Sequence, residues 1–211
     1  ALELGQKMRD PAIQAQALLG LGHARDGDNK VHYRNALHLG EEMRDTSIQA
    51  QALLGLGNAR DENRTHHYQE ALKLGQEMQD RAIQAQAHIG LGNARADGAQ
   101  APHYQAALRL GREMPDPTIQ AQALLGLGNT RADGVQIPHY RHALQLGQEL
   151  RDPSIQAQAL TGLGNTIRNH TAIDYYNQIL QLCCPQHFKT KAQQKIQAIH
   201  GIMASQKRRG R

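Results

Sequence analysis

The sequence predicts an all-α solenoid, a row of stacked helix pairs, and three observations support this fold class. A 14-residue segment, Ser47–Arg60 in one copy, recurs nearly verbatim along the chain in five copies. Neighbouring copies are 35 or 36 residues apart, a period typical of proteins built from stacked supersecondary units. Aromatic residues make up only 3% of the chain and Trp is absent, so a thick core of large side chains is not expected.

Each copy is expected to form two helices. The first begins with an aspartate as N-cap, often followed by proline at the first helical position, as in Asp116-Pro117. It is predicted to end about four turns later near an arginine, whose charge suits the carbonyl end of the helix dipole. These arginines are Arg25, Arg60, Arg95 and Arg131. The second helix is predicted over Val31–Gly40 and its copies, which begin at His66, Pro102, Pro138 and Ala172.

The end of the array is expected to be closed by a capping helix from about Lys189 to Met203. Its apolar residues fall on one side at helical spacing, as a helix that covers the open end of a stack requires. They are Ala192, Ile196, Ile199, Ile202 and Met203. The predicted organisation is a repeat array over residues 1–184, a capping helix over 185–206 and a basic tail over 207–211. Because Ala1–Met8 looks like the inside of a helix, the first repeat is expected to be truncated.

The repeated positions resemble those of the tetratricopeptide-repeat family. Leu127-Gly128-Asn129 resembles the Leu-Gly pair of that family's first helix, and Tyr140, Ala143, Leu144 and Leu146 resemble the aromatic, Ala and Leu positions of its second. The resemblance covers residues 1–182 and implies a right-handed solenoid of about five helix pairs that binds proteins or peptides. There are two departures from the family pattern. Leucine, or histidine in one copy, replaces the family's early aromatic residue, at Leu18, Leu53, His88, Leu124 and Leu160. The turn between the helices is also shorter while the second helix is longer, and this longer second helix is similar to that of G-protein-signalling scaffolds and bacterial peptide-pheromone receptors.

The net charge of +5 belongs to the tail rather than to the repeats. Seven of the 24 Lys and Arg residues follow Asp174, the last acidic residue, so 17 basic and 19 acidic residues remain before it. A nearly neutral body gives little support for a nucleic-acid-binding face. Cys183 and Cys184 are adjacent and cannot link distant segments, which favours an intracellular compartment. No long apolar run or signal-peptide pattern is found, so no membrane association is expected; the basic tail could direct nuclear import.

One stripe of the first helix is the predicted ligand-binding face. Gln122, Leu125 and Asn129 lie at i, i+3 and i+7, and their equivalents repeat along the array. The glutamine row contains Gln51, Gln86, Gln122 and Gln158. The asparagine row contains Asn58, Asn93, Asn129 and Asn165, and the apolar row contains Leu54, Ile89 and Leu125. Gln16, Leu19 and His23 begin the three rows, and Thr161 ends the apolar one.

Carboxamides both donate and accept hydrogen bonds, so rows of Asn and Gln beside a row of leucines suit an extended peptide. Each bond contributes only about 1 kcal/mol, so several rows must act together to give micromolar binding, about 8 kcal/mol. Acidic residues at the mouth of the groove would favour a ligand with basic residues. These are Asp61, Glu62, Asp97 and Asp133. In the competing interpretation, each Asn bonds only the neighbouring helix and fixes the stacking.

Other kinds of site have weaker support in the sequence. His139 and His142 have a helical i, i+3 spacing, but no cysteine or carboxylate completes a ligand set, so neither a metal nor another cofactor is expected. His32, His67, His103 and His139 each precede a repeated tyrosine and are interpreted as surface histidines. The glycines lie within helices rather than in phosphate-binding loops, and no catalytic constellation stands outside the repeats, so no enzymatic activity is predicted.

The sequence therefore predicts a non-enzymatic scaffold that holds an extended protein or peptide segment. Two alternatives stay open. A nucleic-acid-binding solenoid would use the basic tail and the histidine row, and its affinity would fall steeply with salt. A self-association module of a larger protein would instead use the apolar face left open at the N-terminal end.

Overall fold

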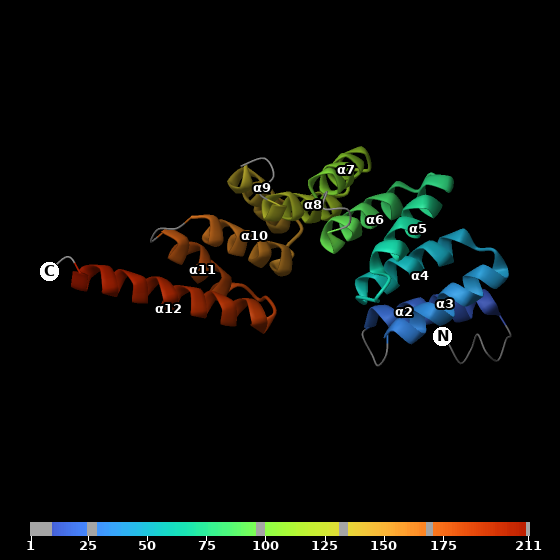
Figure 1. Cartoon of the computed structure of the whole chain (residues 1–211), viewed down its shortest axis with the longest axis horizontal. Coiled ribbons are helices and arrows are strands. Elements are labelled where there is room, and N and C mark those ends of the chain that lie inside the picture. The colour runs from blue at the N-terminus through green and yellow to red at the C-terminus, as the bar shows by residue number, and fades with distance from the viewer. Residues whose placement is uncertain (1–9, 25–28, 96–99, 131–134, 168–170, 210–211) are drawn as a thin grey trace. The chain divides into compact units, whose positions relative to one another are not determined.

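The computed structural model describes residues 10–24, 29–95, 100–130, 135–167 and 171–209, with side chains to residue 203. Over these residues the chain forms eleven consecutive helices and no strand, so the all-α class and the helical-repeat architecture are confirmed (Figure 1). The chain divides into two compact units, residues 1–114 and residues 115–211. Each unit is described by itself.

Each unit is built by successive packing of chain neighbours. Unit 1 contains α2 (Pro11–Ala24), α3 (Asn29–Met43), α4 (Thr46–Asn58), α5 (Arg64–Glu77), α6 (Arg81–Ala94) and α7 (Gln100–Glu113). Unit 2 contains α8 (Pro117–Thr130), α9 (Gln136–Glu149), α10 (Pro153–Thr166), α11 (Thr171–Gln181) and α12 (Gln186–Arg209). Within a unit each helix packs against the next, and the first helices of adjacent repeats also contact each other, as α4 does α6 and α8 does α10.

The repeated aspartates start the first helices as predicted. The side chain of Asp80 accepts hydrogen bonds from the backbone N–H groups of Ala82 and Ile83 at 2.8 and 3.0 Å. The aspartates before α2, α4, α8 and α10 make the same pair of bonds. At the start of each first helix, the aspartate thus pairs two backbone N–H groups that have no partner within the helix. These hydrogen bonds fix the residue at which the helix begins.

The turns between repeats use a left-handed residue just before the aspartate. Arg44, Gln79 and Arg151 have φ of 55°, 56° and 52°, and the N–H of the following Asp donates to a glycine carbonyl at 2.8–2.9 Å. This is the Schellman pattern of helix termination. Before Asp116 this position is occupied by Pro115, which has no backbone N–H to donate. Pro115 is also the first residue of unit 2.

The described first helices α4 and α6 end near the predicted arginines, which lie just outside the helix rather than in its last turn. Arg60 and Arg95 have φ of 55° and 56° and follow the last residues of α4 and α6. They are therefore turn residues that end the helix by left-handed backbone geometry rather than members of its last turn. Arg25 and Arg131 lie outside the described residues.

The paired glycines of the first helices make room for tyrosine rings. A Cβ built on Gly57 would lie 2.5 Å from the ring of Tyr68, and one on Gly90 would lie 2.3 Å from the same ring. Tyr68 is 4% exposed and thus fills the space between successive first helices, α4 and α6. Tyr140 is placed in the same way between Gly128 and Gly162. The absence of a side chain at these glycines therefore lets the tyrosine ring approach the helix backbone closely.

The last helix is longer than predicted and covers its neighbours over its first part only. On α12, Ala192 is buried and packs with α10 and α11, whereas Ile202 and Met203 are 58% and 47% exposed. Figure 1 shows α12 continuing past α11. None of the described helices is long and apolar enough to cross a membrane. The predicted start inside a helix at Ala1–Met8 lies outside the described residues.

Candidate functional site

Each of the four asparagines of the predicted face accepts a hydrogen bond of the same kind from a tyrosine. In each repeat the tyrosine of the second helix donates its hydroxyl to the Oδ1 of the asparagine at the end of the first helix. The distances are 2.9 Å for Tyr68–Asn58, 2.7 Å for Tyr104–Asn93, 2.8 Å for Tyr140–Asn129 and 3.1 Å for Tyr176–Asn165. Asn58 and Asn93 belong to unit 1, and Asn129 and Asn165 belong to unit 2.

This bond fixes what each asparagine presents to solvent. Because Oδ1 accepts from tyrosine, the amide nitrogen carries the remaining capacity, two N–H donors. All four asparagines are exposed, and their Nδ2 atoms donate to no other residue in the described part of the chain. Burial raises the pKa of Tyr68, Tyr104 and Tyr176 above the ordinary value of 10.0, so these hydroxyls keep their protons near neutral pH.

The two glutamines of each repeat have different surroundings. The first donates its side-chain amide to a glycine carbonyl at the end of the preceding helix: Gln49 to Gly40 and Gln156 to Gly147 at 3.0 Å, and Gln84 to Gly75 at 2.9 Å. The second glutamines, Gln51, Gln86, Gln122 and Gln158, are exposed. Only the second row, the one placed on the predicted face, is therefore open to a ligand.

The apolar row offers less surface than expected. Leu54 and Leu125 are 6% and 5% exposed and lie in the core, whereas Ile89 is half-buried. Leu54 packs in a core cluster that contains Ile83 and Leu91 of the next first helix, a contact that helical periodicity within one helix does not reveal. Leucine sites for ligand side chains are thus not present at Leu54 and Leu125, and the exposed face in each unit consists mainly of amides.

The two ends of the rows differ from the middle as the sequence suggested. His23, which replaces asparagine, is exposed, and its ring meets that of Tyr33 edge-on at a centroid distance of 5.7 Å. Thr161, which replaces leucine, donates its hydroxyl to the carbonyl of Ala157 in the previous turn at 2.7 Å. Thr161 therefore satisfies its polar group within its own helix.

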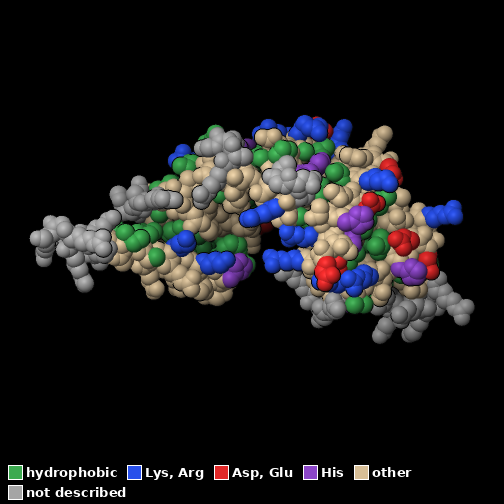
Figure 2. Space-filling view, viewed as in Figure 1, with side chains coloured by type: hydrophobic (Ala, Val, Ile, Leu, Met, Phe, Trp, Pro, Cys, Tyr) green, Lys and Arg blue, Asp and Glu red, His purple; other side chains and the backbone are tan. Residues whose placement is uncertain are grey.

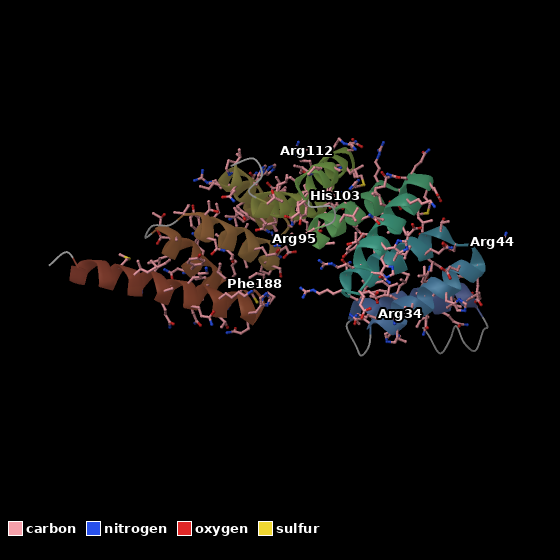
Figure 3. All side chains as sticks on the ribbon, in the orientation of Figure 1. Arg34, Arg44, Arg95, His103, Arg112 and Phe188 are labelled. Atoms are coloured by element: carbon pink, nitrogen blue, oxygen red, sulfur yellow. The ribbon has the colours of Figure 1, made fainter. Side chains whose placement is uncertain are left out.

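Asp61 is not an acidic residue at an open groove mouth. It is only 6% exposed, and its carboxylate contacts Arg34 at 2.7 Å and His67 at 3.3 Å (Arg34 is labelled in Figure 3). The backbone N–H of Asn63, together with His67 and Arg34, lowers the pKa of Asp61 below its ordinary value of 3.8 in spite of burial. Glu62 is exposed, and Asp97 and Asp133 lie outside the described residues.

Two of the repeated histidines have partners that the sequence did not indicate. His67 contacts Asp61, and the Nδ1 of His103 lies 3.2 Å from that of His88. Both repeated histidines are half-buried rather than on the surface. Among the described residues, no group of three or more His, Cys, Asp or Glu side chains could hold a metal ion. For the His88–His103 contact, the one signal in the sequence is that His88 stands in a row of leucines, where the other copies have Leu18, Leu53, Leu124 and Leu160.

No protein-family model and no curated protein matches this chain.

Proposed function

We propose that this chain is a non-enzymatic scaffold that binds an extended protein segment through the amide side chains of its first helices. The carrying observation is the set of four Tyr–Asn hydrogen bonds, which leave the donors of Asn58, Asn93, Asn129 and Asn165 exposed. A main-chain carbonyl of an extended peptide is the complementary acceptor. The exposed Gln51, Gln86, Gln122 and Gln158 add donors and acceptors on the same helices.

Energetic considerations favour an extended ligand over a small one. Each amide-to-carbonyl bond contributes about 1 kcal/mol net, so two asparagines alone give too little for stable binding. Micromolar affinity, about 8 kcal/mol, requires that the asparagines and glutamines of several repeats act together. Pre-orientation by tyrosine reduces the side-chain entropy lost on binding, which increases what each amide contributes.

We further infer that the helix pairs are tetratricopeptide-like, about five in number and wound into a right-handed solenoid. The repeated Leu-Gly-Asn of the first helix and the buried Tyr and Ala of the second support this inference. A cytoplasmic location, or a nuclear one directed by residues 207–211, would accord with the two free cysteines, of which Cys183 is exposed.

The competing interpretation is that asparagine only ties the two helices of a repeat together, and the Tyr–Asn bonds fit that role too. The test is a selection of random peptides of about 12 residues on the wild-type chain, followed by affinity measurement with the double variant Asn58→Ala/Asn93→Ala, both of whose positions lie in unit 1. We expect at least a tenfold loss of affinity, since two donors worth about 1 kcal/mol each are removed. Unchanged affinity would leave the asparagines with a structural role only.

Two controls separate this function from its rivals. Circular dichroism should show full helicity for the double variant, with only the modest loss of stability expected for two missing hydrogen bonds. Deletion of residues 204–211 and a rise in salt should leave peptide affinity nearly unchanged. A steep loss with salt, or with the deletion, would instead indicate nucleic-acid binding through the basic tail.

A further inference from the structure

His88 occupies a position that is leucine in every other copy of the repeat. The equivalent residues are Leu18, Leu53, Leu124 and Leu160, which are between 2% and 8% exposed and belong to the core. His88 is half-buried there, on the side of α6 that faces α7. A titratable group has thus replaced an apolar one between the two helices of a single pair.

The partner of His88 is a second histidine. The Nδ1 atoms of His88 and His103 are 3.2 Å apart, and the ring centroids are 5.5 Å apart (His103 is labelled in Figure 3). At this distance one Nδ1–H donates to the other Nδ1, so the contact holds when the pair carries a single proton between the facing nitrogens. Once both nitrogens are protonated, neither can accept, and two cations face each other in a partly buried site.

The surroundings oppose protonation of His88. Desolvation, the neighbouring His103 and the guanidinium of Arg109 lower the pKa of His88 from 6.5 to about 4. Both charged contributors come from α7; α4 and α5, which also pack against α6, supply none among the described residues. Arg109 is itself paired with Glu113 at 2.9 Å.

We propose that the His88–His103 pair is an acid-sensitive contact that holds α6 and α7 together near neutral pH and loosens this helix pair when both imidazoles are protonated. Because Tyr104 follows His103 and holds Asn93, the loosening reaches one of the exposed amides. That consequence for ligand binding rests on the proposed function, whereas the acid sensitivity itself does not.

The direction of the pH effect follows from proton linkage. The unfolded chain takes up a proton at His88 below about pH 6.5, and the folded chain does so only near pH 4, so stability is lost as the pH falls through this interval. The test is urea denaturation of the wild-type chain and His88→Leu at pH 7.5 and 5.0. The wild-type unfolding constant should rise roughly tenfold more than that of His88→Leu, allowing for the partial exposure of His88.

His88→Leu restores the residue found in the other copies and is therefore expected to fold. His142→Gln, which removes an exposed histidine of α9, is the matched control and should keep the wild-type pH response. If His88→Leu loses stability with acid as much as wild type does, the proposal is overturned. Histidine NMR titration gives a second readout: the pKa of His88 should lie near 4 and should rise in His103→Gln. An ordinary, unshifted titration of His88 would also contradict the proposal.

Discussion

The helix pairs α6–α7 and α8–α9 are made of nearly the same sequence and differ at one decisive position. Both fix an exposed asparagine with a tyrosine hydroxyl, Asn93 with Tyr104 at 2.7 Å and Asn129 with Tyr140 at 2.8 Å. In α8 the leucine position holds Leu124, which is 2% exposed, whereas α6 holds His88 against His103. The shared residues thus build the frame and orient the amide, and we expect the exchange of leucine for His88 to determine how the pair responds to acid.

The charged residues around these helices differ as well. On the face shown in Figure 2, unit 1 carries acidic, basic and histidine side chains close together. Arg81, Arg109 and Glu113 form one ion-pair cluster of unit 1. Glu113 accepts from Arg109 at 2.9 Å and lies 3.5 Å from Arg81. These groups are well exposed, so each ion pair contributes little to stability, and the distinction between the helix pairs depends on the half-buried histidines.

The largest expected effect tests the shared frame. A methyl group on Gly90 or Gly162 would lie 2.3 Å from the ring of Tyr68 or Tyr140, so Gly90→Ala and Gly162→Ala should each lower the free energy of unfolding by about 2 kcal/mol or more. Gly20→Ala is the control, because its methyl group meets nothing within 4 Å; it should stabilise α2 by up to about 1 kcal/mol. Urea denaturation measures all three. Equal behaviour of Gly90→Ala and Gly20→Ala would show that tyrosine does not fill this space.

The next largest effect is expected when the histidine of α6 is introduced at the equivalent position of α8. Leu124→His places an imidazole in a site that is 2% exposed, which should cost about 2 kcal/mol at pH 7.5 because a polar group enters the core. Its position relative to His139 is that of His88 relative to His103, so an additional loss is expected between about pH 6.5 and 4. Denaturation of Leu124→His at both ends of this interval is the measurement. An acid response equal to that of wild type would mean that the leucine position alone does not create the switch.

A smaller effect is expected from the tyrosine hydroxyls. Tyr104→Phe and Tyr140→Phe keep the rings between the helices but remove the donors to Asn93 and Asn129, so each should cost about 1 kcal/mol. The two values should agree with each other, since the bond is the same in both repeats. A measured cost near zero in differential scanning calorimetry would show that the asparagines find equivalent partners in water.

The smallest effects separate the two glutamine rows. Gln84→Ala removes the bond to the carbonyl of Gly75 and should cost about 0.5–1 kcal/mol, and Gln156→Ala should do the same at Gly147. Gln86→Ala and Gln158→Ala change exposed residues and should lie within about 0.5 kcal/mol of wild type. Thermal melts of the four variants would contradict this assignment if the second glutamines cost more than the first.

The repeat and its helices could be predicted from sequence because their determinants are local. An Asp N-cap satisfies donors two and three residues away, and the fixed period places each second helix. The burial of Leu54 could not be predicted, since it depends on the neighbouring repeat rather than on the helix that carries the residue. His88 and His103 are 15 residues apart, and only the packing of α6 on α7 brings their nitrogens together.

The most direct test of the proposed function is the affinity of one selected peptide for wild type and for Asn93→Asp. An aspartate at this position keeps an oxygen to accept from Tyr104 but has no N–H donor, so it preserves the helix contact and removes only what a ligand would use. Gln69→Glu, at an exposed position of α5, adds the same charge as a control. We expect Asn93→Asp to melt like wild type and to lose about fivefold in affinity, since one donor worth about 1 kcal/mol is removed, with Gln69→Glu unchanged. Wild-type affinity for Asn93→Asp would contradict the proposal that these amides bind the ligand.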